Sequence, residues 1–449
     1  MRGFISPDRN QITFMPASVD EYLSKKHIAR FIVQIVDQLD FTAIYRRYGT
    51  SGSTPYDPKM LMAMLFYGYS TGTVSSRKLE AATKDSLPMR FICGNLHPDH
   101  DTISTFRKNF LKEIEVFFVD ILVIAKDMGF LKMGNVNLDG TKMQADASKH
   151  SAMSHEYMER LEKQLQAEVE RLTKMAEEAD EREAAELDIP GEIQRREDRM
   201  AMLAVAKKAL QERARQRDEK NKAEYDEKMK ARAEKEAETG KKPTGRAPKA
   251  PVEGVLPGDQ YNFTDPESRI MPTANGFEQS YNAQAAVTDN MFIAGAYITD
   301  HCNDKQEFIP ALEAVSQEKL GKIDTANADT GYFSEANIIC AATMKIDPFI
   351  AVGRQPHNQW LDQRLAREVP SATTEPATPK QQMSQKLNTP EGKENYGKRK
   401  MTVEPVFGII KEIMGFRQFS LRGAAKVHGE WMLVCASYNL RRLFKLVNS

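Results

Sequence analysis

A charged, alanine-rich stretch between residues 152 and 238 is the sequence feature that most constrains the fold of this chain. Its apolar side chains recur at spacings of three and four, which is typical of helices. They are Leu161, Leu165, Val169, Leu172 and Ala176, followed by Met200, Leu203, Leu210 and Ala214. Asp188-Ile-Pro-Gly between the two runs predicts a helix break, so we expect an antiparallel helical hairpin. A solvated spacer, a DNA-gripping arm and a dimerising arm are all compatible with this pattern.

Segments typical of strands flank the hairpin. Residues 134–148 predict one strand, and a Pro/Gly/Lys linker at 240–258 precedes two more strands within 279–300, joined by a turn at Asp289-Asn290. The expected elements that follow are helix 304–320, strand 322–329, helix 334–345, strand 347–354, and helices 403–416 and 426–447. Residues 365–395 are rich in Pro, Thr, Gln and Ser and predict a mobile loop. Without the hairpin, this order predicts an α/β fold: a mixed sheet with helices packed on it.

The first 130 residues predict helices. Residues 29–39 have apolar side chains at helical spacing, and Asp57-Pro58 is a typical helix start. Asp101 is expected to cap one long helix that continues to residue 130. Arg107 and Lys108 on that helix favour a helix-turn-helix-like module that binds DNA, and a plain helical bundle is an equally good interpretation.

Composition sets the broad class of the protein. A chain of 449 residues predicts two or three domains. Lys+Arg and Asp+Glu both total 63, so the net charge of zero does not indicate a nucleic-acid partner. A protein with zero net charge can still have basic surfaces. The four cysteines are scattered, the N-terminus lacks the apolar stretch of a signal peptide, and no run of about 18 apolar residues occurs. We therefore expect a cytoplasmic protein without a membrane span.

Three acidic residues stand at the edges of expected core elements. Asp139 lies on the first strand, Asp329 ends the next parallel strand, and Pro405 predicts that Glu404 lies in the first turn of a helix. Lys411 falls two turns further on the same helical face. If the fold brings the three acids together, they would hold two divalent ions for phosphoryl transfer. Singly, each has a structural alternative: a turn at Asp139-Gly140, a helix cap at Asp329, and a first-turn acid at Glu404.

Other candidate sites are weaker. Cys93, His97 and His100 resemble three zinc ligands without a fourth. Asp329-Thr-Gly is the tripeptide of aspartic proteases, whose mechanism needs two such aspartates, and the chain has one Asp-Thr-Gly. Trp360 is either a residue that stacks on a flipped base or an ordinary loop or core residue, and we expect Trp431 to be part of the core.

Several motifs resemble those of the DDE transposases of bacterial insertion sequences. They are YDPKMLMAMLFYGYSTGTVSSRKLE, LDGTKMQADASKHS, TDPESRIM with SYNAQAAV, NADTGYFSEANI, YGKRKMTVEPVFGIIK, LRG and YNLRR. The block at 396–411 is similar to the family's Tyr…Arg…Glu…Lys motif, with Tyr396, Arg399, Glu404 and Lys411. Arg399 stands one residue further from Glu404 than is usual, so Lys400 is an alternative. The helical insertion after the first Asp resembles one branch of the family.

This resemblance implies a function. Asp139, Asp329 and Glu404 would be the catalytic metal ligands in a ribonuclease-H-like core, with two Mg²⁺ ions per site, or Mn²⁺ in their place. The enzyme would cut double-stranded DNA at element ends and join the 3′-hydroxyl to target DNA, as a homodimer on DNA in the bacterial nucleoid. Candidate DNA contacts are Tyr396, Arg399, Lys400, Lys411, Lys142, Arg107 and Lys108, with Arg422 a further one. A catalytically inactive DNA-binding or coiled-coil scaffold is the alternative.

The same reasoning divides the chain into three parts. Residues 1–130 form an N-terminal helical DNA-binding domain, residues 131–151 and 259–449 form the catalytic domain, and residues 152–258 form the inserted hairpin and a basic linker.

Overall fold

The computed structural model describes residues 18–49, 54–179, 188–240, 247–353 and 378–449. Contacts divide the chain into two compact units: Met1–Asp146 with Arg269–Ser449, and Ala147–Ser268. The inserted unit therefore extends a few residues beyond the expected 152–258 at both ends. The N-terminal helices belong to the same unit as the sheet.

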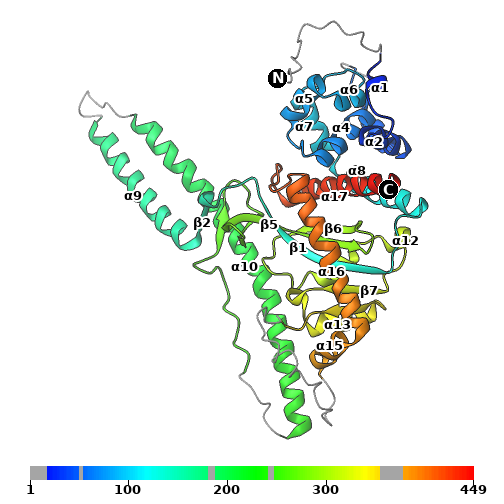
Figure 1. Cartoon of the computed structure of the whole chain (residues 1–449). Helices are drawn as coiled ribbons and strands as arrows, with labels where there is room; N and C mark the ends of the chain where they lie inside the picture. Colours follow the sequence, from blue (N-terminus) through cyan, green and yellow to red (C-terminus); the bar gives the residue numbers. More distant parts are fainter. Residues whose placement is uncertain (1–17, 50–53, 180–187, 241–246, 354–377) are drawn as a thin grey trace, which may run out of the picture. The chain divides into compact units, whose positions relative to one another are not determined.

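A mixed sheet forms the centre of the first unit (Figure 1). Its strands are β1 (Asn135–Gln144), β4 (Arg269–Thr273), β5 (Gly276–Thr288), β6 (Ile293–Thr299), β7 (Thr325–Ala328) and β8 (Asp347–Ile350). They lie in the order β4-β5-β1-β7-β8, and β6 also pairs with β5. β5 is antiparallel to β1, β4 and β6, whereas β7 is parallel to both β1 and β8. The α/β class, the mixed sheet and the hairpin of β5 and β6 are as predicted.

Helices cover both faces of this sheet. α16 (Pro390–Gly408) lies along one face and contacts β1, β5, β7 and β8. α11 (Phe308–Glu313) contacts β5 and β6, and α13 (Glu335–Thr343) contacts β8. The short elements α12 (Gln317–Leu320) and η2 (Thr330–Tyr332) complete the connections around β7.

The N-terminal part of the unit is helical. Its helices are α1 (Val19–Tyr22), α2 (Ile28–Gln38), α3 (Thr42–Tyr45), α4 (Pro58–Thr71), α5 (Ser76–Asp85), α6 (Leu87–Cys93), α7 (His100–Asn109) and α8 (Leu111–Asp127). Asp57 caps α4 as predicted. The single long helix capped by Asp101 is wrong: Asp99 caps α7 through the N–H of Thr102, at 2.6 Å, and Phe110, whose backbone is not helical, separates α7 from α8.

The C-terminal helix α17 (Ala424–Val447) ties these helices to the sheet. It packs on α4, α8 and β6. Trp431 on α17 is fully buried, donates to the carbonyl of Gln284, and stacks against Phe407, which confirms its place in the core.

Two predictions near the C-terminus are wrong. Residues 378–395 are not a loop: they form α15 (Pro379–Asn388), which Thr378 and Gln381 start with a capping box, and the first turns of α16. Residues 365–377 lie outside the described part of the chain. Glu404 is not in the first turn of its helix, because α16 starts at Pro390 and includes Pro405. A π-helical turn, η3 (Ile409–Ile413), follows, and such turns often accompany a disturbed helical hydrogen-bond pattern.

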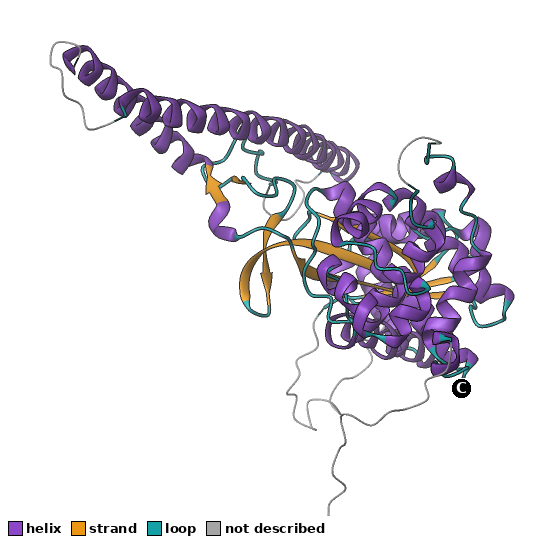
Figure 2. Cartoon of the chain, turned by 90° about the horizontal axis from the view of Figure 1, so that it is seen from above, coloured by secondary structure: helices purple, strands orange, loops and turns teal. Residues whose placement is uncertain are grey.

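The inserted unit is a helical hairpin with a small sheet at its base. α9 (His155–Ala179) and α10 (Ile189–Thr239) lie side by side (Figure 2). β2 (Ala152–Ser154) follows the short helix η1 (Lys149–Ser151) and pairs with β3 (Gln260–Asn262). The unit's core consists of Met158, Leu161, Leu165, Leu203, Ala206, Leu210 and Tyr261. The predicted hairpin is confirmed, including the start of α10, where Asp188 accepts from the N–H of Gly191.

Within the residues that are described, every helix is too short or too polar to span a lipid bilayer.

Candidate active site

The first two predicted acids lie on neighbouring parallel strands. β1 and β7 pair with a constant offset, Asn135 with Thr325 and Asn137 with Asn327. The offset of 190 residues (325 − 135) is also the separation of Asp139 and Asp329 (329 − 139), so the two aspartates are level at the point where β7 ends. Residues opposite each other in a sheet point to the same face, which places both carboxylates on one side.

Local structure explains how each aspartate is held. Asp139 is not in a turn: it lies within β1 opposite Ala285, and its Oδ1 accepts from the N–H of Gly140 at 2.9 Å. Asp329 caps η2 and accepts from the N–H of Gly331 at 2.8 Å, so the cap interpretation is right and does not remove the residue from the site.

α16 brings Glu404 and Arg399 to the same face. Arg399 donates from Nη1 to Oδ2 of Asp139 at 3.0 Å, and its Nη2 lies 3.9 Å from Oε1 of Glu404. The Arg399 side chain is 9% exposed, whereas that of Glu404 is 55% exposed. Two of the three predicted acids, Asp139 and Glu404, therefore lie within ion-pair distance of one guanidinium, and Asp329 acts on it only through its charge.

Burial dominates the electrostatics of Asp139. It raises the pKa of this carboxyl to about 6; the Arg399 guanidinium opposes the shift, and the carboxylates of Asp329 and Asp304 add to it. The site is thus a partly buried cluster of negative charge.

Two further residues of the predicted motif lie beside this cluster. The Tyr396 ring lies 5.9 Å from the Arg399 guanidinium. Lys411, on η3, donates to the hydroxyl of Thr141, two residues beyond Asp139 on β1. Burial, the larger effect, and the nearby charge of Arg417 lower the pKa of the Lys411 ammonium.

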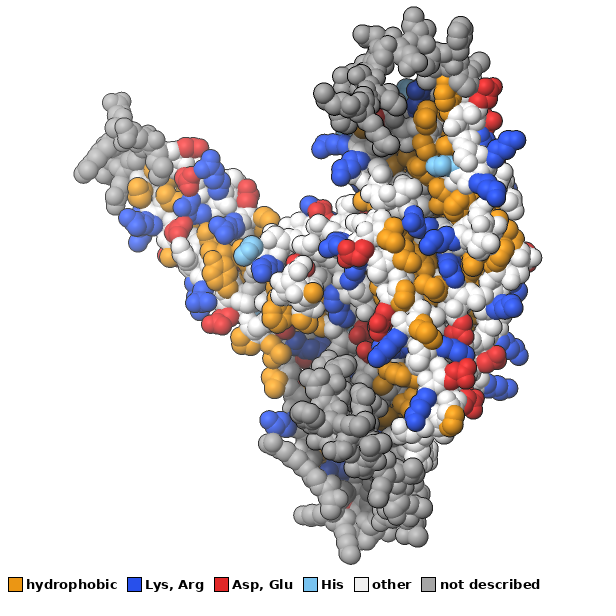
Figure 3. All heavy atoms as spheres, viewed as in Figure 1, with side chains coloured by type: hydrophobic (Ala, Val, Ile, Leu, Met, Phe, Trp, Pro, Cys, Tyr) orange, Lys and Arg blue, Asp and Glu red, His pale blue; other side chains and the backbone are white. Residues whose placement is uncertain are grey.

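The remaining predicted DNA contacts are in different settings. Lys400 and Lys108 are exposed. Arg107 is buried and donates to the hydroxyl of Tyr69 at 2.8 Å and to the carbonyl of Val74 at 3.2 Å. Arg422 donates to the carboxylate of Asp146 at 2.8 Å. On the face shown in Figure 3, Lys and Arg side chains are spread among Asp and Glu rather than gathered in one patch.

Lys142 lies on the opposite face of the sheet from Asp139. Side chains alternate along a strand, so Gly140 and Lys142 face away from α16. The Lys142 ammonium is 3.5 Å from the carboxylate of Asp304, a residue on the loop after β6 that sequence reasoning missed.

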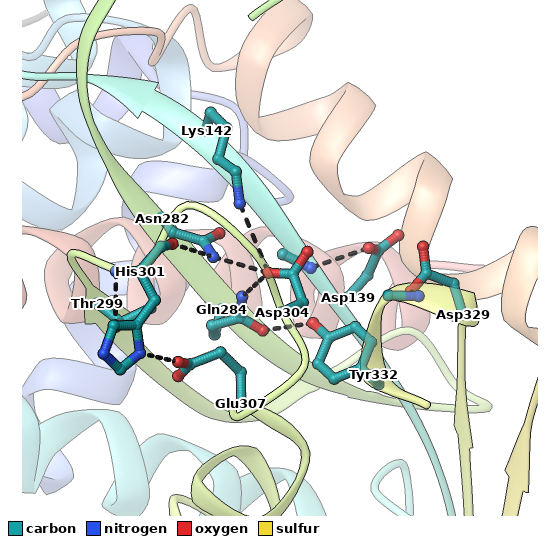
Figure 4. Close-up of polar contacts among 12 residues, drawn as sticks. Asp139, Lys142, Asn282, Gln284, Thr299, His301, Asp304, Glu307, Asp329 and Tyr332 are labelled. Carbon is teal, nitrogen blue, oxygen red and sulfur yellow. Dashed lines mark hydrogen bonds and ion pairs between the residues drawn. The ribbon is translucent and has the colours of Figure 1, made fainter. Parts of the chain in front are cut away.

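Asp304 is the centre of a polar network on that face (Figure 4). The side-chain amides of Asn282 and Gln284 on β5 both donate to its Oδ1 at 2.7 Å. Gln284 also accepts from the hydroxyl of Tyr332, three residues after Asp329. Gly140 makes this approach possible, since a Cβ there would lie 2.8 Å from Oδ1 of Asp304. The glycine after Asp139 is consistent with close packing at this position, but no sequence pattern identified Asp304 as the acid that packs against it.

The other candidate sites have structural partners. His97 bonds to the hydroxyl of Thr83 at 3.1 Å, and His100 bonds to the Glu80 carboxylate at 2.7 Å, while Cys93 is buried. Trp360 lies outside the described residues.

Two segments of the chain match known protein families. A family described as "Transposase domain (DUF772)" matches residues 17–109, and one described as "Transposase DDE domain" matches residues 365–444. These two matches support an insertion-sequence DDE transposase. The DDE match includes Arg399, Glu404 and Lys411, whereas Asp139 and Asp329 are outside it and are brought to the site by the fold. No curated protein and no solved structure matches the chain.

DDE transposases generally use a divalent metal ion. Carboxylate oxygens are the ligands that hard divalent cations prefer, and Asp139, Asp329 and Glu404 supply such oxygens. Within the described residues, however, no three His, Cys, Asp or Glu side chains stand close enough to hold an ion as they are. The donor chemistry fits a divalent ion, and in this structure the Arg399 guanidinium lies within ion-pair distance of Asp139 and Glu404.

Proposed function

We propose that this transposase cuts DNA at the ends of its element and joins the freed 3′-hydroxyl to target DNA, with Asp139, Asp329 and Glu404 as its catalytic acids. The observation that carries this proposal is the pairing of β1 with β7, which makes Asp139 level with Asp329 under the helix that presents Glu404. The specific family branch, with a Tyr…Arg…Glu…Lys motif and a helical insertion after the first Asp, is part of the proposal.

The strand order supports a ribonuclease-H-like core. β1, β5 and β6 form an antiparallel meander, and β7 and β8 then add in parallel on the other side of β1. β1 is thus central, with the first acid on it and the second at the end of its parallel neighbour. Such edges of mixed sheets, where parallel strands end, are common places for ligands.

The proposed reaction has two phosphoryl transfers. Water attacks a phosphodiester at the element end, the bond from phosphorus to the 3′-oxygen breaks, and that oxygen takes up a proton to become a 3′-hydroxyl. This hydroxyl then loses its proton and attacks a target phosphodiester. A new phosphorus–oxygen bond forms, the bond from phosphorus to the target's 3′-oxygen breaks, and that oxygen takes up a proton. When bound, two Mg²⁺ ions, or Mn²⁺ in their place, would activate the attacking oxygen and stabilise the leaving one.

The chain's own residues would bind and orient the reactants. Asp139 and Asp329 would hold the ions from the sheet, and Glu404 would reach them from α16. Lys411, Lys400 and Tyr396, on or just after α16, are placed to contact phosphates near the site, and exposed Lys108 would do so from the N-terminal helices. We further propose that residues 1–130 bind DNA, that 131–151 and 259–449 form the catalytic domain, and that the transposase acts as a homodimer on two ends.

A cleavage assay tests this proposal. Full-length protein is incubated with Mg²⁺ or Mn²⁺ and a supercoiled plasmid that carries the cognate ends. Nicking should vanish in Asp139→Asn, Asp329→Asn and Glu404→Gln while DNA binding persists. Glu412→Gln is the matched control, since Glu412 is an exposed acid in η3, about two turns after Glu404, and is paired with Arg417. This variant should cleave like wild type. Wild-type binding without cleavage would instead favour the inactive scaffold.

A further inference from the structure

Arg399 makes contacts that differ from those expected of a phosphate-binding arginine. Its side chain is 9% exposed, and its guanidinium contacts two of the proposed catalytic acids. The neighbouring Lys400 is exposed on the same helix. A phosphate would therefore meet Lys400 freely, whereas it would meet Arg399 only after the ion pair with Asp139 had broken.

Both oxygens of Asp139 already have partners. Oδ1 accepts from the N–H of Gly140 at 2.9 Å, and Oδ2 accepts from Arg399 at 3.0 Å. Among the described residues, Arg399 is the single cation within ion-pair distance of Asp139. A cation added at either oxygen of this carboxylate lies close to the guanidinium on Oδ2, and two positive charges repel each other in a partly buried setting.

The guanidinium is also incompletely bonded. Its Nε is buried and has no hydrogen-bond partner, and its second acidic contact, to Glu404, is long at 3.9 Å. A buried donor without a partner costs free energy, so Arg399 is not locked in place by a complete set of hydrogen bonds. Glu404, which is more than half exposed, is free to turn away from it.

We propose that Arg399 is the resident counter-cation of the catalytic acids, which competes with divalent ions for Asp139 and must leave Oδ2 before the site can be loaded. This inference rests on the proposed function, because it takes Asp139 as a metal ligand. In the free transposase Arg399 neutralises Asp139 and keeps Glu404 near it. It is a positioning residue whose charge lowers the affinity of the empty site for metal.

The test is a titration of full-length protein with Mn²⁺ in the absence of DNA, in which free Mn²⁺ is followed by electron paramagnetic resonance. Arg399→Gln should bind Mn²⁺ about tenfold more tightly than wild type, a ratio equivalent to ~1.4 kcal/mol, the size of one charge-assisted hydrogen bond. Arg399→Lys, which keeps the charge, should bind with an affinity between the two. Lys400→Gln removes the same charge one residue away and should stay within about twofold of wild type.

The direction of the change separates this proposal from a purely structural role. If Arg399 only supported the fold, Arg399→Gln would bind Mn²⁺ equally or more weakly, and that result would overturn the proposal. Circular dichroism checks that each variant folds. If Arg399→Gln unfolds, Arg399→Lys still tests the proposal, because Arg399→Lys must also bind Mn²⁺ more tightly than wild type.

Asp139→Asn distinguishes failure of this inference from failure of the proposed function. Loss of Mn²⁺ binding in Asp139→Asn without tighter binding in Arg399→Gln would refute the counter-cation alone. Unchanged Mn²⁺ binding in Asp139→Asn would remove both proposals.

Discussion

Glu430 offers a stringent test of how the N-terminal helices are joined to α17. Its carboxylate is fully buried. Oε2 accepts from the backbone N–H groups of Ser420 and Leu421 at 2.9 and 3.0 Å, and Oε1 accepts from the hydroxyl of Tyr69 at 3.1 Å. Arg107 lies 3.9 Å away and is itself buried. One side chain thus connects α4, α7, α17 and the loop before α17.

The cost of removing it follows from these contacts. Glu430→Ala leaves two backbone N–H groups and the Tyr69 hydroxyl without their acceptor and the Arg107 guanidinium without its counter-charge. Breaking a buried ion pair from one side costs about 3–5 kcal/mol. Glu430→Gln keeps the shape and one acceptor oxygen for the two N–H groups, and its amide can donate to the Tyr69 hydroxyl. It loses the charge opposite Arg107, so we expect a cost of about 1.5–3 kcal/mol.

The assay is urea unfolding followed by tryptophan fluorescence in a Trp360→Phe background. Trp431, next to Glu430 on α17, is then the single indole, because the chain has two tryptophans. Arg107→Met completes a double-mutant cycle with Glu430→Gln and should show favourable coupling. The reasoning fails if Glu430→Ala lies within about 1 kcal/mol of the parent, a typical cost for any substitution, or if the Gln variant is as unstable as the Ala variant.

Three further predictions concern β1 and α16. Gly140→Ala should destabilise the protein by about 1–3 kcal/mol, because its Cβ would lie 2.2 Å from Nε2 of Gln284. Gly397→Ala on α16 has open space around it and should stabilise the protein by up to ~1 kcal/mol. Equal effects of the two variants on urea unfolding would contradict this prediction. The folded-state pKa of Asp139, about 6, is above its unfolded value, so the stability that this carboxyl contributes is lost as pH rises from about 4 through 6. The free energy of unfolding of Asp139→Asn should therefore rise by about 2 kcal/mol relative to that of wild type between pH 4.5 and 7.5. A difference that does not change with pH would show that Asp139 does not titrate in this way. Lys400→Ala should reduce the slope of log K for DNA against log salt by about 0.9, and an unchanged slope in a filter-binding titration would exclude a phosphate contact.

The parts of the fold that follow from local pattern were predictable. Asp57-Pro58 marks the start of α4, and the period of Leu161, Leu165 and Leu203 gives the hairpin. Asp139 and Asp329 were assigned to neighbouring parallel strands because each follows a short apolar run, and the register of β1 with β7 agrees.

Errors arose where tertiary contacts override local signals. Pro405 is typical of a helix start, yet α16 continues through it, since the buried side chains of Val403 and Val406 hold the helix against the sheet. Asp101 and Asp99 are both plausible caps, and only the conformation of the chain selects Asp99.

The partners of the charged side chains could not be predicted from the sequence. Arg399 and Arg107 were both expected to contact phosphate because arginine often does so, yet each contacts a carboxylate more than two hundred residues away. Asp304 was overlooked because its role depends on space left by Gly140 on another strand. Such long-range pairings arise from packing and have no local pattern.

The most direct test of the central claim is metal-directed cleavage of the protein backbone. Full-length transposase is loaded with Fe²⁺ in place of Mg²⁺ and treated with ascorbate and peroxide, and the fragments are mapped by mass spectrometry. If Asp139, Asp329 and Glu404 share one cation site, cuts should appear near all three positions and disappear together with excess Mg²⁺ or in Asp139→Asn. Cuts near one acid alone, or a pattern unchanged in Asp139→Asn, would contradict a shared site.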